Sequence, residues 1–376
     1  MTPTTDERDA SMMASALALA RRGLGRVWPN PAVGCIIADE SEADAPRVIA
    51  RGWTGEGGRP HAEAMALEQA GDKARGATAY VTFEPCSHHG QTPPCAAALI
   101  DAGVARVVSA LEDPDPRVSG KGHAALKAAG IDLVVGCMAR EAARLNAGFI
   151  TRVRLGRPHV TLKLATSNDG MIAAAPGKPV RLTGEAADAR VHMMRAQADA
   201  ILVGSGTWRA DDPQLTCRLA GMGGSSPVRV VIDARAELPL ISQLVTTIGT
   251  APVWAMVGEG ADSARRDALA RAGVKLIDVT GAPSGRLDIA AVLSTLARQG
   301  ITRLLVEGGA QMAQSLIGAD LADQIVIFEA PVTLGPRAVP ALGHAARDML
   351  ADETRFVLVS SDRLGPDTMR AYEKKR

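Results

Sequence analysis

The chain has 376 residues, and 42 Lys and Arg nearly balance 41 Asp and Glu, for a formal net charge of +1. That balance excludes the basic excess of a general nucleic-acid or membrane-surface binder. Aromatic residues, at 3%, are too few for a platform that stacks bases. With 47% hydrophobic residues, the chain can form two well-buried domains around sites for a small, polar ligand.

Cysteine usage and the first residues indicate the compartment. Five cysteines form an odd and sparse set in a long chain, which does not read as a disulfide framework. Residues 1–9 carry three acidic side chains where a signal peptide has a basic start. No apolar run is long enough to span a membrane. We therefore expect a cytoplasmic protein with no membrane partner.

Helices and strands alternate through the first part of the chain. The patterns predict helices over 12–22, 60–70, 93–102 and 122–129. Strands are predicted over 32–38, 47–53, 79–83, 104–111 and 131–135, with 47–53 as the hairpin mate of 32–38. Thr92 is expected to cap the third helix, with Pro93 at its first position. This alternation indicates a mainly parallel sheet with helices on both faces.

The alternating pattern breaks around residues 148–158, which contain three arginines, two glycines and a proline. We place a linker at 149–157 between domains at 1–148 and 158–376. The second domain again reads as α/β, with strands predicted over 159–166, 200–204, 228–233, 253–257, 274–279, 303–307, 324–329 and 355–360.

A set of metal-binding side chains lies in the first domain. His61 and Cys95 are expected in the first turns of two helices, and Cys86 follows a strand. One His and two Cys are a ligand set of catalytic zinc, which leaves its fourth position to water. Zinc lowers the pKa of that water toward about 7, and Glu63 is placed to move protons. We expect the helix N-terminus to lower the pKa of Cys95.

The spacing of these residues is unusual. Zinc nucleobase deaminases carry H-x-E followed by P-C-x-x-C, with the Glu outside the ligand set. Here eight residues separate Cys86 from Cys95, and they include His88 and His89. We expect these two histidines to line the pocket. A fourth ligand from either would instead close the site and make it structural.

Glycine motifs mark the second domain, although it has no complete G-x-G-x-x-G. The turn Gly204-Ser205-Gly206 lacks the third glycine. Glu307-Gly308-Gly309 follows a predicted strand and precedes a helix, which leaves free N–H groups for an anion. By itself, this second motif is more often a plain strand-to-helix turn.

Longer motifs resemble a known family. The run EPCSHHGQTPPC at 84–95, with HAEAMAL at 61–67 and PNPAVGC at 29–35, resembles the deaminase half of the bifunctional riboflavin-biosynthesis deaminase–reductases. LKLATS at 162–167, RAQ at 195–197, ADDP at 210–213 and EGG at 307–309 resemble the reductase half. The resemblance implies an N-terminal cytidine-deaminase-like α/β/α domain and then a dihydrofolate-reductase-like α/β domain.

The same resemblance implies two reactions and their residues. A diaminohydroxypyrimidine with a phosphoribosylamino group loses ammonia at Zn2+, and NADPH then reduces its ribosyl group to ribityl. Zn2+ would be bound by His61, Cys86 and Cys95, with Glu63 as proton donor. NADPH would contact Thr166, Thr207, Asp211, Gly308 and Gly309. Substrate would contact Arg195, Leu215, Arg218 and Glu307, and family members are commonly homo-oligomers.

Three positions depart from the family pattern: Asn168, Pro179 and Arg181 stand where leucine, serine and tryptophan are expected. They put local contacts and cofactor preference in question. Two alternatives stay open from the residues. One is a tRNA-type base deaminase with an appended domain, which the neutral charge and the cysteine spacing disfavour. The other is a structural zinc fold with a nucleotide-sensing domain.

Overall fold

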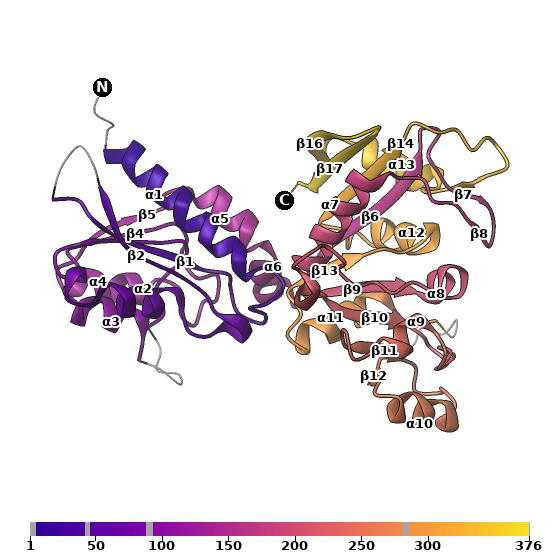
Figure 1. Ribbon diagram of the computed structural model, residues 1–376, viewed down its shortest axis with the longest axis horizontal. Helices are drawn as coiled ribbons and strands as arrows, with labels where there is room; N and C mark the ends of the chain where they lie inside the picture. The colour runs from indigo at the N-terminus through magenta and orange to yellow at the C-terminus, as the bar shows by residue number, and fades with distance from the viewer. Residues whose placement is uncertain (1–4, 42–45, 88–92, 281–285, 376) are drawn as a thin grey trace. The chain divides into compact units, whose positions relative to one another are not determined.

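A computed structural model of the chain describes residues 5–41, 46–87, 93–280 and 286–375 (Figure 1). The chain divides into two compact units, residues 1–156 and 157–376. Among the described residues, no helix combines the length and the apolar character that crossing a membrane requires.

The N-terminal unit contains a five-stranded sheet. Its strands are β1 (Gly34–Asp39), β2 (Arg47–Trp53), β3 (Thr78–Val81), β4 (Arg106–Ser109) and β5 (Asp132–Val135), in the order β2-β1-β3-β4-β5. The predicted hairpin of β1 and β2 is confirmed. The prediction of a mainly parallel sheet is correct except for β1, which runs antiparallel to both of its neighbours, whereas β4 pairs in parallel with β3 and β5. The connection from β2 to β3 crosses over β1, so β2 and β3 lie on either side of β1 and run in the same direction.

Helices cover both faces of this sheet (Figure 1). Residues of β1 alternate between the two faces, as a strand requires. Ile36 packs in a cluster with α1 (Thr5–Ala20) and α5 (Ala139–Leu145). Ile37 packs in a second cluster with α2 (Ala62–Ala70), α3 (Cys95–Asp101) and α4 (Lys121–Ala128). Two separate apolar cores therefore hold an α/β/α sandwich together.

Two predicted helix starts need correction, and both concern the metal-binding residues. Helix α2 begins at Ala62, and His61 is the extended residue that precedes it, with φ −70° and ψ 153°. Proline at position 60 pre-sets a turn, and the helix starts only after His61. Helix α3 begins at Cys95, preceded by Pro94. The expected cap Thr92 lies outside the described residues.

The segment expected as a linker, 149–157, is mostly helix α6 (Ala147–Leu155). Phe149 packs edge-on against Phe83, with ring centroids 5.7 Å apart, so this helix belongs to the N-terminal core. Asn146, just before it, forms two hydrogen bonds with the backbone of Ala32: it accepts from the N–H at 2.9 Å and donates to the carbonyl at 3.1 Å. The three arginines made the segment resemble a linker, although one face of the helix is buried.

The C-terminal unit contains a nine-stranded sheet in the order β12-β11-β10-β9-β13-β6-β14-β17-β16. Neighbours are parallel from β12 to β14, and β17 and β16 are added antiparallel. The strands are β6 (His159–Ser167), β9 (Ala200–Gly204), β10 (Val228–Ile232), β11 (Val253–Val257), β12 (Lys275–Asp278), β13 (Arg303–Val306), β14 (Gln324–Ala330), β16 (Phe356–Leu364) and β17 (Asp367–Lys374). β10 and β11 are buried along nearly their whole length, as expected for parallel strands covered on both faces.

Helices and a small second sheet complete this unit. The helices are α7 (Glu185–Ala196), α8 (Ser205–Asp211), α9 (Gln243–Thr246), α10 (Ser263–Arg271), α11 (Ile289–Arg298), α12 (Ala310–Gly318) and α13 (His344–Ala351). The small sheet has the order β15-β7-β8, with β7 (Met171–Ala175), β8 (Lys178–Pro179) and β15 (Val339–Pro340). Glu307-Gly308-Gly309 lies between β13 and α12, as predicted. In the other glycine motif, Gly204 ends β9 and Ser205 begins α8, so the strand passes directly into the helix.

Candidate functional site

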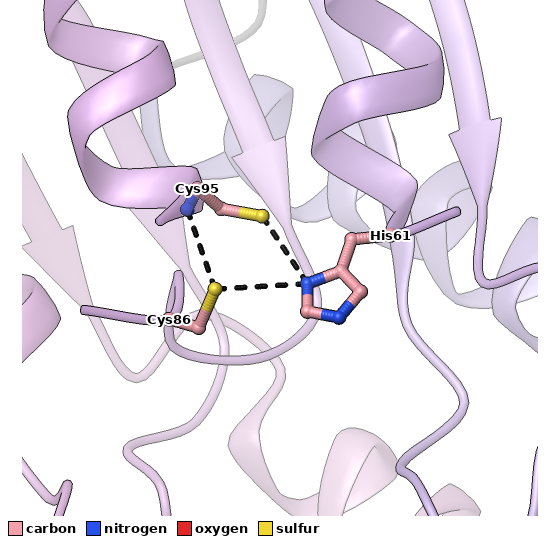
Figure 2. A group of neighbouring side chains, drawn as sticks. All are labelled: His61, Cys86 and Cys95. Carbon is pink, nitrogen blue, oxygen red and sulfur yellow. Dashed lines mark hydrogen bonds between the residues drawn. The ribbon is translucent and has the colours of Figure 1, made fainter. Parts of the chain in front are cut away.

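Three side chains converge in the N-terminal unit, beyond the ends of β2 and β3. The Nδ1 atom of His61 lies 3.3 Å from the Sγ of Cys95 and 3.6 Å from the Sγ of Cys86 (Figure 2). One ligand atom from each residue lies within 4.8 Å of the others. An imidazole nitrogen and two thiols form a donor set that suits zinc. The structure thus brings together three residues that sequence spacing left far apart.

The two thiols of this cluster differ in acidity. The hydrogen bond from the Cys95 thiol lowers the pKa of Cys86 to about 4, against the effect of burial. The backbone N–H of Cys95 also donates to the Cys86 Sγ, at 3.3 Å. The pKa of Cys95 is raised, because its thiol donates to Cys86 and is buried. The expectation for Cys95 was therefore wrong: the N–H at the start of α3 stabilises the neighbouring sulfur instead.

Glu63 is the second residue of α2 and is only 4% exposed. Its pKa is raised to about 7, mainly by burial and to a smaller degree by a Cys86 thiolate, whereas a backbone hydrogen bond and His61 oppose the rise. A carboxyl group with a pKa near the working pH can both take up and release a proton. This property is what an acid–base residue beside a metal site requires. His88 and His89, the other candidates at this site, lie outside the described residues.

Glu84 has a position that sequence reasoning missed. Its buried carboxylate accepts hydrogen bonds from four backbone N–H groups, those of Asp113, Gly120, Gly122 and His123, at 2.8–3.3 Å. These bonds fasten the loop before α4 to the segment that carries Cys86. A signal was present in the sequence, because an acidic residue two positions before a metal ligand is placed to orient it.

A second candidate site is a cavity of about 790 Å³ in the C-terminal unit. It lies where β9 and β10 end and where α8 and α12 begin, the place at which parallel sheets bind ligands. Thr207, Asp211 and Gly309, three of the expected cofactor residues, line it. Gly308 and Thr166 are not among the lining residues. Gly308 directly precedes Gly309, and Thr166 is buried near the end of β6.

The residues expected to contact substrate gather around an ion pair. The guanidinium of Arg195 donates twice to Glu307, at 2.7 and 2.9 Å, and Lys163 lies 3.8 Å from the same carboxylate. Burial raises the pKa of Glu307, but Arg195 and Lys163 outweigh it and hold this pKa at about 2. Lys163 was not singled out from the sequence.

The other two expected substrate residues lie in the loop after α8. Leu215 is buried and has a positive φ of 57°. The N–H of Arg218 donates to Nδ1 of His192 at 3.3 Å. Arg195 also reaches this loop and donates to the carbonyl of Thr216 at 3.1 Å. Helix α7 thus connects the loop to Glu307 at the end of β13.

Two of the three departures from the family pattern have local partners. Asn168 accepts a hydrogen bond from the hydroxyl of Thr333 at 2.9 Å. Arg181 forms an exposed ion pair with Asp188 at 2.7 Å. Pro179 pairs with Ala173 in the small sheet. Asn168 and Arg181 therefore have structural contacts of their own.

Comparison with known proteins covers both units. Residues 6–111 match the family model of the cytidine and deoxycytidylate deaminase zinc-binding region, and residues 158–369 match that of the RibD C-terminal domain. Riboflavin biosynthesis protein RibD of Escherichia coli K12 is 39% identical over 96% of this chain and 98% of its own length. The protein of the same name from Bacillus amyloliquefaciens is 38% identical, over 94% and 93%.

Solved structures agree over the whole chain. Acinetobacter baumannii RibD, form 1, aligns with a TM-score of 0.86 at 36% identity, covering 99% of this chain and 100% of that one. A diaminohydroxyphosphoribosylaminopyrimidine deaminase/5-amino-6-(5-phosphoribosylamino)uracil reductase from Thermotoga maritima aligns with a TM-score of 0.83 at 31% identity, over 99% and 100%. The expected order of a deaminase-like and then a reductase-like domain is confirmed. The chain belongs to the RibD family of riboflavin biosynthesis proteins, in which a zinc-binding deaminase is joined to a reductase.

Proposed function

We propose that this chain catalyses two successive steps of riboflavin biosynthesis. The first is hydrolytic deamination of a diaminohydroxy-phosphoribosylaminopyrimidine in the N-terminal unit. The second is reduction of the ribosyl group to ribityl by NADPH in the C-terminal unit. The observation that carries the proposal is the cluster of His61, Cys86 and Cys95 with the buried Glu63 beside it. The name of the Thermotoga relative supports the choice of substrate.

In the deamination, His61, Cys86 and Cys95 would hold Zn2+, which supplies a Lewis acid that makes water a better nucleophile near neutral pH. Water adds to the ring carbon that carries the amino group. Glu63 takes a proton from the attacking water and delivers it to the departing amine, which leaves as ammonia. Its pKa of about 7 suits both transfers at the same pH.

In the reduction, the 790 Å³ cavity would hold the cofactor, which supplies the hydride. Thr207, Asp211 and Gly309 would contact it from the cavity wall, with Gly308 and Thr166 next to them. The free N–H groups at the start of α12 suit its phosphates. The substrate would be positioned by four residues outside the cavity lining: Arg195, Leu215, Arg218 and Glu307.

The test is to measure ammonia release and NADPH oxidation separately on the zinc-loaded chain. Glu63→Gln should lower ammonia release by about 10²–10⁴-fold while zinc content is retained. Glu68→Gln, an exposed change on the same helix, is the matched control. Asp211→Ala should impair NADPH oxidation only, when deaminated substrate is supplied. Normal ammonia release by Glu63→Gln would contradict the role of Glu63, and no ammonia release by the zinc-loaded wild type would contradict the deaminase assignment.

We also propose that the protein works in the cytoplasm as a homo-oligomer. The five cysteines are all free thiols in the described structure, which suits a reducing compartment. The proposal of an oligomer rests on the family resemblance, because family members are commonly homo-oligomers. Light scattering on the purified chain would measure its mass against the monomer mass of 39.0 kDa. A monomer at micromolar concentration would contradict the proposal.

A further inference from the structure

One loop of the C-terminal unit contains two backbone conformations that residues other than glycine seldom adopt. This 212–218 loop follows α8, and in it Asp212 has a φ of 37° and Leu215 a φ of 57°. Positive φ values at such residues are uncommon because the side chain crowds the backbone. They persist only where the surrounding structure holds them, and they gather at functional sites. The groups that hold this loop are therefore of interest.

Residues from outside the 212–218 loop hold it near both ends. The backbone N–H of Gln243 donates to the carboxylate of Asp212 at 2.9 Å, and its side-chain amide donates to the carbonyl of Asp212 at 2.6 Å. Arg195 donates to the carbonyl of Thr216 at 3.1 Å. Between these two points lies Gln214, whose carbonyl has a partner of its own.

That partner is Arg229, the second residue of β10. Its Nη1 donates to the carbonyl of Gln214 at 3.2 Å and to the hydroxyl of Thr247 at 2.7 Å. Its Nη2 donates to the carbonyls of Thr247 at 3.0 Å and Ala251 at 2.5 Å. One guanidinium group thus connects the 212–218 loop to the turn that follows α9.

Arg229 is an unusual choice for a residue that only supports the fold. Its side chain is 0% exposed, and each acceptor that the described residues offer it is uncharged. Its Nε has no hydrogen-bond partner among these residues. Burial lowers the pKa of Arg229 to about 10, so the group is still charged at neutral pH. A buried cation without a carboxylate partner is costly to a fold, which indicates that this arginine is kept for what it holds in place.

We propose that Arg229 is a positioning residue of the reductase site, which holds the 212–218 loop in the shape that presents Leu215 and Arg218 to the phosphorylated pyrimidine. This inference rests on the proposed reductase function. It adds a fully buried residue that lies outside both the cavity lining and the expected substrate contacts. The hydrogen bond to Gln214 acts directly before Leu215. Without it, the positive φ of Leu215 loses its nearest restraint, and the loop relaxes away from the substrate.

The test compares Arg229→Met with Thr247→Val on the full chain, with deaminated substrate supplied. Both changes remove hydrogen bonds of the same guanidinium group, but only the first frees the loop. Arg229→Met should raise KM for the pyrimidine by about tenfold or more, with a smaller change in kcat. KM for NADPH should change by less than about twofold, because no residue of the 212–218 loop lines the cavity. Thr247→Val should lower the unfolding midpoint and leave both KM values near those of wild type.

Hydrogen exchange followed by mass spectrometry gives a second readout, which does not depend on turnover. Amides of the 212–218 loop should exchange faster in Arg229→Met than in wild type, because the loop has lost a restraint. In Thr247→Val they should exchange at the wild-type rate, since the bond from Arg229 to Gln214 remains. If Arg229→Met does not fold, Arg229→Lys takes its place. Lysine keeps the charge but lacks the planar fork that reaches both the loop and the turn, so the same pattern is expected.

The outcomes separate this inference from the reductase assignment. A selective rise in KM for the pyrimidine, together with faster exchange in the 212–218 loop, supports the role of Arg229. An unchanged KM, an equal rise for NADPH, unchanged exchange in the loop, or the same effects in Thr247→Val overturns it while the reductase assignment stands. A wild-type protein that does not oxidise NADPH with this substrate overturns the reductase assignment and this inference with it.

Discussion

The carboxylate of Glu84 accepts the backbone N–H of Gly122 at 2.8 Å, although 38 residues separate the two in the chain. A Cβ atom on Gly122 would lie 1.9 Å from the carbonyl oxygen of Pro85. The start of α4 and the segment that carries Cys86 are therefore in direct contact, with no room for a side chain between them. Changes at either residue should alter the metal cluster.

Replacing Glu84 by Gln should weaken zinc binding. A glutamine keeps one acceptor oxygen and turns an amide donor toward backbone N–H groups, which leaves buried donors unpaired. We expect a loss of stability of about 2 kcal/mol and of zinc affinity of about 10–100-fold. Chelator competition would measure the affinity. Glu112→Gln, an exposed change in the loop that Glu84 holds, should have little effect, and equal results for both variants would contradict this role for Glu84.

Gly122→Ala should destabilise the N-terminal unit, because its Cβ collides with backbone and not with a flexible side chain. Overpacking of this kind costs about 1–3 kcal/mol. Thermal unfolding of the metal-free chain measures the change. Gly318→Ala is a fair comparison, since a Cβ atom on that helical glycine would meet nothing within 4 Å beyond its own helix and chain neighbours. An unfolding midpoint for Gly122→Ala at or above that of wild type would show that the backbone at Pro85 can move aside at little cost in stability.

Zinc binding should release a proton from Cys95 at neutral pH. Cys86 has a pKa of about 4 and is already a thiolate, whereas the raised pKa of Cys95 keeps its thiol protonated. A metal must displace that proton, so the affinity for zinc should rise with pH between about 6 and 8. Calorimetry in buffers of different ionisation enthalpy counts the protons released. Affinity that stays flat across this range would mean that Cys95 does not bind zinc as a thiolate.

Glu307 should make the free energy of unfolding of the C-terminal unit depend on pH in the acid range. Its pKa is about 2 in the fold, against 4.5 for an ordinary glutamate. Between these values the unfolded chain binds more protons than the folded one. The stabilisation is complete above about pH 4.5 and is lost as the pH falls toward 2, by an amount on the order of 3 kcal/mol.

Urea unfolding at pH 5 and pH 3 would measure this contribution of Glu307. The Glu307→Gln protein should be less stable at pH 5, because Arg195 loses its partner. Its free energy of unfolding should also change less than that of wild type between the two pH values. Glu329→Gln removes a half-exposed pair with Arg370 and serves as the control. Equal acid dependence in wild type and Glu307→Gln would contradict the low pKa.

The sequence predicted some elements well because their signals are local. The strands 47–53, 200–204 and 253–257 have the predicted bounds. The last two are buried in a covered sheet, and such strands are short apolar runs between turns. His61, Cys86 and Cys95 could be selected because zinc needs those residue types. Their meeting point could not be derived, since it depends on the pairing of β1 with β2 and β3.

Other features depend on contacts that no local pattern records. Strand β17 alternates polar and apolar residues, and its place between β14 and β16 is fixed only by tertiary pairing. The partners of Glu84 lie at 113–123, on the far side of α3 in the chain. The acidity of the two thiols depends mainly on which thiol donates to the other, and to a smaller degree on which sulfur receives the N–H of Cys95. From the sequence, this N–H would be assigned to the sulfur of Cys95, the residue that begins the helix. In the structure it donates to the sulfur of Cys86.

The bonds between Asn146 and Ala32 also bear on how the protein is made. The N-terminal unit needs Asn146 and Phe149 to close the region around Ala32 and Phe83. A nascent chain that has emerged from the ribosome only as far as α4 already holds all the proposed zinc ligands, yet it lacks the helix that seals its core. Metal capture and completion of the fold would then be separate events during translation, and the first could precede the second.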